Sequence, residues 1–338
     1  NYLYQQILQP LLKYDELPEQ LVIIPDGPLY YLPFELLLTD NPTNRKFQDF
    51  PYLLKQHAIS YCFSSKAFFQ LKAKRHRKQP KSKILAVAPS FYKVNRLKNT
   101  LYASRDLLDT LYHNTAEVET ISTKISCDQL VSKKASKANF IAEVGDYRII
   151  HLATHGKVDD LNPNFSFVAF SNTIDTLKFP YRLYINEINT LSLNADMVVL
   201  SACETGLGQI YQGEGILGCS RSFLSIGAKS IITTLWNIND RQTANLMDQF
   251  YTQLQQEGLG KAQALRQAKL AYLEASDDFY AHPKYWAAFM AYGDMSAIST
   301  HLKPAFNPDV LIFTGLGLAL VGLLVSFCIW KRIKRQVG

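Results

Sequence analysis

Two stretches decide the fold of this chain: "RIIHLATHG", residues 148–156, and "VVLSACETG", residues 198–206. Each is an apolar run that ends in a reactive side chain and a glycine shortly after it, with His155 in the first and Cys203 in the second. Continuous apolar runs are typical of strands that are buried on both faces of a parallel sheet. In such a sheet functional groups collect at the carboxyl ends of the strands, so the two stretches predict two halves of one site.

The segments around these stretches alternate between strands and helices. Apolar runs and turn residues predict strands at residues 21–24, 58–65, 83–91, 197–200, 229–236 and 285–293. Apolar periodicity predicts helices at residues 1–17, 103–112, 136–144, 214–228, 240–256 and 261–275. This alternation implies right-handed βαβ units, and therefore an α/β fold in which helices cover both faces of a mostly parallel sheet.

The positive charge of the chain is concentrated in two segments. The 338 residues carry a formal net charge of +7, while residues 72–83 and 331–338 contain clusters of Lys and Arg without any acid. The remainder is mildly acidic. Because the first cluster has no interleaved aromatic residue and contains Pro80, it predicts a solvated basic linker and argues against a nucleic-acid partner.

Neither the cysteines nor the histidines predict a metal site. The five cysteines show no paired spacing, which argues against a disulfide framework and leaves room for one reactive thiol. His151 and His155 are four residues apart, which along a strand is about 13 Å, too far for one ion to meet both. We therefore expect no metal or other cofactor, and we expect His151 to be a packed residue of its strand.

His155 and Cys203 together suit nucleophilic catalysis. A thiol attacks as the thiolate, and a neighbouring imidazole promotes that state and later protonates the leaving amine. Since glycine allows a sharp turn after each strand, the backbone N–H groups of Gly156 and Cys203 are candidates for an oxyanion hole. A buried structural cysteine beside an unrelated histidine is the alternative, and the matched positions at two strand ends favour the dyad.

These motifs resemble the two signature motifs of the CHAT family, bacterial relatives of caspases and separases. His155 precedes Cys203 by 48 residues, close to the caspase pattern, in which the histidine lies about 50 residues upstream. "LVIIPDGPLYYLPFELL", "ILAVAPSF", "GEGILGCSRSFLSIGAKSIITTLWNIND" and "YWAAFMAYG" resemble further blocks of the family in the same order. The resemblance covers roughly residues 20–293. It implies a caspase-like fold without a cofactor, with Cys203 as nucleophile and His155 as general base or imidazolium partner in peptide-bond cleavage through an acyl-enzyme.

The resemblance also implies a specificity. "TTLWNIND" is similar to the separase segment whose aspartate lines the pocket for a basic P1 side chain, which suggests Asp240 in an S1 pocket that selects Arg or Lys. Asp240 fits an N-cap of the following helix equally well, and the two roles are compatible. Asp159 and Asp160 are weaker candidates for the same pocket, and Glu204 is expected to orient the loop beside the nucleophile.

The C-terminal segment differs in composition from the rest of the chain. Residues 310–330 carry no charge and are long enough to cross a hydrocarbon core of about 30 Å. We expect residues 1–20 to be a helix and linker from an upstream region, 21–297 the peptidase domain with the basic linker inside it, 298–309 a linker, 310–330 a transmembrane helix and 331–338 a basic tail.

Two arguments about membrane orientation compete. The Lys and Arg residues after the span place the C-terminus in the cytoplasm, and so put the catalytic domain on the periplasmic side of a bacterial inner membrane. A reduced catalytic thiol favours a catalytic domain in the cytoplasm. The charge asymmetry acts directly on insertion, so the periplasmic orientation is slightly favoured.

The leading hypothesis is a membrane-anchored cysteine endopeptidase that acts on protein substrates. An upstream repeat region or an activating protein partner would regulate it, as the resemblance implies. The alternative is a non-catalytic CHAT scaffold that serves signalling or assembly at the membrane. For an enzyme that cleaves after Arg or Lys, the basic linker offers Arg75, Arg77 and Lys78 as self-processing sites.

Overall fold

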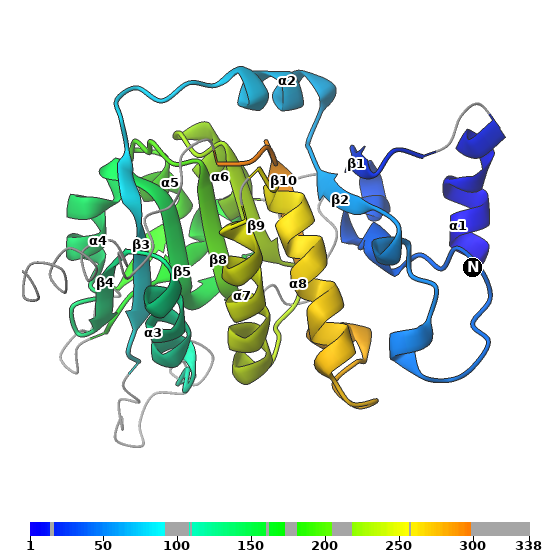
Figure 1. Ribbon diagram of the computed structural model, residues 1–338. Helices are drawn as coiled ribbons and strands as arrows, with labels where there is room; N and C mark the ends of the chain where they lie inside the picture. The colour runs from blue at the N-terminus through cyan, green and yellow to red at the C-terminus, as the bar shows by residue number, and fades with distance from the viewer. Residues whose placement is uncertain are drawn as a thin grey trace, which may run out of the picture.

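The computed structural model describes residues 1–13, 17–91, 108, 110–159, 162–172, 181–204, 218–256 and 258–298. A ten-stranded sheet forms its centre, in the order β1-β2-β10-β9-β8-β5-β3-β4, with β6 attached to β5 and β7 to β6 (Figure 1). The strands are β1 Gln20–Ile23, β2 Ala58–Tyr61, β3 Lys81–Pro89, β4 Cys127–Ser132, β5 Tyr147–Lys157, β6 Phe167–Ala169, β7 Arg182–Tyr184, β8 Met197–Glu204, β9 Ser230–Thr234 and β10 Phe289–Gly293.

Apart from the short β6 and β7, the sheet consists of two parallel groups that meet in one antiparallel pair. Strands β9, β8, β5, β3 and β4 run in one direction, and β1, β2 and β10 run in the other, with β10 antiparallel to β9. We call the edge where the larger group begins the amino edge, and the edge where it ends the carboxyl edge. Most neighbouring strands are parallel, so the mostly parallel sheet that the sequence predicts is confirmed.

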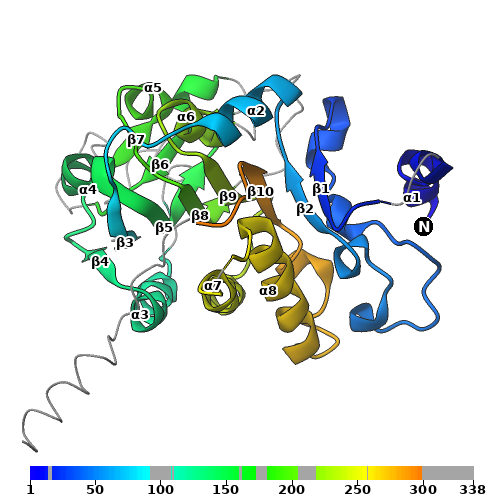
Figure 2. The ribbon, with the colours of Figure 1, turned by 45° about the horizontal axis from the view of Figure 1, so that its top comes forward.

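Helices cover both faces of the sheet, as predicted. Figure 2 shows α3, α7 and α8 on one face and α2, α5 and α6 on the other. The strands bury alternate side chains towards each layer: Leu152 and Leu200 belong to one apolar core, and Ala153 and Val199 to the other. The helices are α1 Tyr2–Ile7, α2 Ser65–Ala73, α3 Asn114–Lys124, α4 Lys137–Glu143, α5 Ile185–Ile188, α6 Gly218–Ser225, α7 Asp240–Leu254 and α8 Lys261–Ala275.

Most residues of the basic run at 72–83 are exposed, but its two ends belong to regular elements. Lys72 lies in the last turn of α2, which begins after a cap in which the Ser64 hydroxyl accepts the Ala67 N–H at 3.1 Å. Lys81 already belongs to β3. The residues between these two elements are held against the amino edge of the sheet, because Asn194 and Asp196, which precede β8, bind the backbone of Arg77 and Lys78 and the side chain of His76.

Some predicted elements lie outside the described residues. Six of the ten residues of the helix predicted at 103–112 fall there, and the described residues 108 and 110–112 are not helical. The apolar span at 310–330 falls there entirely. Within the described part of the chain, no helix has both the length and the apolar character needed to cross a membrane.

Candidate functional site

The two motifs form neighbouring parallel strands, as the sequence predicts. In the register of β5 and β8, Gly156 lies opposite Cys203 and His155 lies opposite Ala202. Both positions are at the carboxyl edge, where the strands of the larger group end. The register of β5 and β8 is therefore the observation that brings His155 and Cys203 together.

A β-bulge in β5 sets the position of His155. Leu152 pairs with Leu200 but His155 pairs with Ala202, so β5 has one residue more than β8 between these points. A bulge of this kind changes the direction of the side chains that follow it. The Thr154 hydroxyl donates to the Ala169 carbonyl at 2.7 Å and so ties the bulge to the end of β6.

The imidazole of His155 lies in a nearly closed environment. Its residue is 4% exposed, and its ring centroid is 5.0 Å from that of Phe91 at an interplanar angle of 55°. Phe91 follows the end of β3, the next strand in the sheet. The ring therefore has an aromatic wall that restricts its orientation.

Gly156 continues the strand, so the sharp turn predicted directly after His155 is wrong. Strand β5 extends to Lys157, and Gly156 pairs with Val168 of β6 on one side while it faces β8 on the other. The extension occurs because β6 and β7 add a short antiparallel ribbon to this end of β5. The oxyanion-hole role of the Gly156 and Cys203 N–H groups stays a prediction.

A buried asparagine that the sequence reading missed links the strand ends beside the site. Asn114 begins α3 and is 3% exposed. Its Nδ2 donates to the Pro89 carbonyl at 2.8 Å and to the Ala153 carbonyl at 3.2 Å. It therefore joins the end of β3 to β5, two residues before His155. An asparagine at a helix start signals a cap in sequence, and nothing in the pattern signals a bridge between strands.

Asp240 lies at the start of α7, at the carboxyl edge. The N-cap of α7 is Asn239, whose side chain accepts the Arg241 N–H at 3.1 Å, so the N-cap alternative for Asp240 is wrong. Instead, Asp240 Oδ2 accepts the backbone N–H of His113 at 2.6 Å and so ties α7 to the start of α3. The residue is half-buried.

Two further carboxylates, Asp159 and Asp160, are predicted candidates for the pocket, and Glu204 is predicted to orient the loop. Asp159 Oδ1 accepts the Asn162 N–H at 2.8 Å, in the turn between β5 and β6. Asp160 lies outside the described residues, and Glu204 is the last residue of β8.

His151 is a packed residue of β5, as the sequence predicts. It is fully buried, with Nε2 2.9 Å from the Glu117 carboxylate of α3 and Nδ1 3.1 Å from the Tyr251 hydroxyl of α7. The two groups are close, but their geometry is not that of an aligned hydrogen bond. Across the described ranges, no group of three or more His, Cys, Asp or Glu side chains is placed to hold a metal ion.

Two of the other thiols are poor nucleophiles. Cys62 and Cys127 are both free cysteines. Burial raises the pKa of Cys62 above its ordinary value and raises that of Cys127 to about 12. Since the thiolate is the reactive form, both side chains are expected to be inert at neutral pH.

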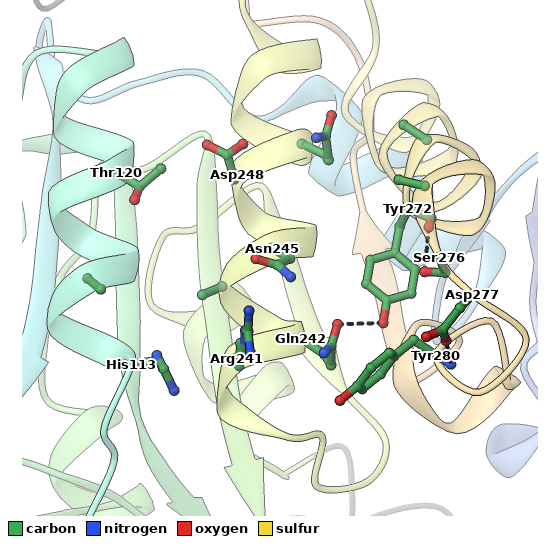
Figure 3. Close-up of a pocket in the computed structure, with 15 residues that line it drawn as sticks. His113, Thr120, Arg241, Gln242, Asn245, Asp248, Tyr272, Ser276, Asp277 and Tyr280 are labelled. Carbon is green, nitrogen blue, oxygen red and sulfur yellow. Dashed lines mark hydrogen bonds between the residues drawn. The ribbon is translucent and has the colours of Figure 1, made fainter.

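A cavity of about 660 Å³ lies on the helical face, between α3, α7 and α8 (Figure 3). The Tyr272 hydroxyl donates to Gln242 Oε1 at 2.7 Å within it. His113 and Arg241 line its end near the carboxyl edge, but Asp240 does not line it. Its lining residues belong to α3, α7 and α8 or flank these helices in the sequence. This cavity is therefore distinct from the candidate site of His155 and Cys203 at the strand ends.

The strand order and the two helical layers define a caspase-like α/β fold. The crystal structure of the Arg-specific cysteine proteinase gingipain R matches with a TM-score of 0.51 at 11% sequence identity, over 88% of this chain and 68% of that one. The Saccharomyces cerevisiae separase in its complex with securin gives a TM-score of 0.49 at 11% identity, over 86% of this chain and 17% of that one.

The chain belongs to the CHAT domain family, whose sequence model matches residues 1–294. The resemblance seen in the two motifs is thereby confirmed. Tetratricopeptide repeat protein 28 of Homo sapiens and of Mus musculus is 24% identical over 304 residues, which is 81% of this chain. The chain spans 12% of the length of these relatives.

Proposed function

We propose that the chain is a cysteine endopeptidase in which His155 and Cys203 form the catalytic dyad. The register that places Cys203 beside the His155–Gly156 pair at the carboxyl edge carries this proposal. His155 takes the thiol proton, and the thiolate attacks the substrate carbonyl. The C–N bond then breaks, His155 protonates the leaving amine, and water hydrolyses the acyl-enzyme.

We further propose that Asp240 selects a basic P1 side chain. Its position at the carboxyl edge and its half-buried carboxylate support this role. One oxygen is used by the His113 N–H, and an Arg or Lys of the substrate would bind the carboxylate through a charge-assisted hydrogen bond. An Arg-specific proteinase has the same fold, so the fold admits such a pocket.

The surroundings of the domain are part of the proposal. The uncharged segment 310–330 supports a membrane anchor. The relatives named for tetratricopeptide repeats, of which this chain spans only a small part, support regulation by a repeat region or a protein partner.

The decisive test is covalent labelling by a peptidyl electrophile with Arg at P1. We expect labelling of the wild-type chain at Cys203 and its loss in Cys203→Ala and His155→Ala. Cys62→Ala and Cys127→Ala are matched controls, because burial keeps both thiols protonated, and both should label like the wild type. Persistent absence of labelling, with the candidate repeat region or partner supplied, would favour the non-catalytic scaffold.

A further inference from the structure

A basic segment crosses the amino edge of the sheet, on the side opposite the dyad. We call residues 72–83 the basic strap. Figure 1 shows this part of the chain passing from α2 over the tops of the central strands and down into β3. Because the parallel strands begin at this edge, the strap lies at the far end of the sheet from His155.

The strap is held in place by its backbone, so its side chains are displayed from a defined surface. Asn194 Oδ1 accepts the Arg77 N–H at 3.0 Å, and Asn194 Nδ2 donates to the Lys78 carbonyl at 2.6 Å. His76 Nε2 lies 2.9 Å from Asp196 Oδ1. These contacts bind the strap to the residues that directly precede β8.

The nearby carboxylates neutralise only part of the strap, in which Lys83 pairs with Asp128 at 2.9 Å. Asp196 is buried and already pairs with Arg148 at 3.1 Å and Lys229 at 2.8 Å. Lys78 pairs with Asp146, an exposed contact of the kind that contributes little. The exposed cationic residues of the strap are Lys72, Arg75, Arg77, Lys78 and Lys81. Of these, Arg77 also donates to the Ser192 hydroxyl, and Lys81 donates to the Tyr147 hydroxyl at 3.2 Å. The amino edge therefore presents a net positive surface.

The chain leaves the domain at this same edge. Strand β10 is antiparallel to β9, so it ends where β9 begins, and the Asp294 N–H donates to the Lys229 carbonyl at 2.9 Å. Met295 follows, and its carbonyl accepts the Lys261 N–H at 2.9 Å. In the sequence, residues 299–309 separate Ile298 from the apolar segment 310–330.

We propose that the basic strap binds an anionic lipid surface, so that the amino edge faces the membrane and the carboxyl edge faces away from it. The inference rests on the proposed membrane association but not on the dyad. Each Lys or Arg near an anionic bilayer strengthens binding about fivefold. Cations held on the edge that Asp294 and Met295 reach after β10 fit such a surface, and they leave the site open to protein substrates.

The test uses the full chain with Leu318→Asp and Leu323→Asp, which prevent insertion of the apolar segment and leave only peripheral binding. Flotation with vesicles of 30% phosphatidylglycerol in phosphatidylcholine then measures the affinity. We expect Lys72→Gln with Arg75→Gln to weaken binding roughly 25-fold. The matched control, Lys133→Gln with Lys134→Gln, removes two exposed cations after β4, at the carboxyl edge, and should change binding less than about threefold.

Three results would overturn the proposal: an equal loss in both variants, equal binding to pure phosphatidylcholine, or tighter strap-dependent binding to nucleic acid at the same salt. Circular dichroism confirms that each variant is folded. The anchor is tested separately, by resistance of the chain with an intact apolar segment to alkaline carbonate extraction. The peptidase is also tested separately, since labelling of Cys203 should be unchanged in the strap variant.

Discussion

Removing the Asn114 side chain tests whether a link between strand ends positions the dyad. Asn114→Ala deletes two buried hydrogen bonds and leaves the Pro89 and Ala153 carbonyls without these donors. Each bond contributes about 1 kcal/mol, and an unsatisfied buried carbonyl adds a further cost, so we expect a loss of about 2–4 kcal/mol in the free energy of unfolding. Urea denaturation of the purified chain measures this loss.

The same variant has a readout that a merely structural role would not move. Because the link holds β5 two residues before His155, we expect labelling of Cys203 to slow about tenfold or more under conditions where the variant is fully folded. Asn139→Ala is the matched control, since its Nδ2 makes one exposed bond, to the Lys134 carbonyl at 2.9 Å. If the two variants lose the same stability and label at the wild-type rate, the link does not position the site.

Three further variants test single contacts. Asp196→Asn should cost about 3–5 kcal/mol at pH 7 because it leaves the buried Arg148 charge unpaired. Burial alone would raise the pKa of Asp196, but Lys229 outweighs burial and holds that pKa below its ordinary value. The stabilisation by the ionised carboxylate is therefore present above about pH 4 and is lost as the pH falls further. Denaturation at pH 7 and at pH 3 should show that the difference in stability between wild type and variant shrinks at the lower pH. Asp240→Asn keeps an oxygen for its backbone N–H partner, so melting should be unchanged while cleavage after Arg and Lys falls; unchanged cleavage would refute the S1 role. Gly227→Ala should lower the melting temperature more than Gly258→Ala, because Gly227 has a φ of 141° and a Cβ there would meet a backbone oxygen at 2.0 Å, whereas the Gly258 site is open.

The elements that the sequence predicts well are those whose signal is local. Helix α8 runs from Lys261 to Ala275, as predicted, because its apolar periodicity is regular. Strands β5 and β8 are predicted because both are continuous apolar runs. Strand β4, at residues 127–132, is missed because it lies at the sheet edge and fully buries only one side chain, so it has no apolar run.

The features that the sequence does not predict depend on contacts between distant residues. The bulge before His155 appears only when β5 is paired with β8, because it is a difference in length between two strands. The basic strap looks solvated from its composition, yet Asn194, more than a hundred residues later, holds its backbone. Neither the bulge nor the contact of Asn194 with the strap can be predicted from the local sequence pattern.

The pairing of β2 with β10 has a consequence for how the protein folds during its synthesis. Strand β2 pairs with β1 on one side and with β10 on the other, and β10 is more than 220 residues further along the chain. During synthesis the first two strands therefore wait, with one edge unpaired, until nearly the whole domain has left the ribosome. A chain truncated before residue 289 would be expected to fold its larger parallel group while exposing that edge, which makes β2 the segment where aggregation of incomplete chains should begin.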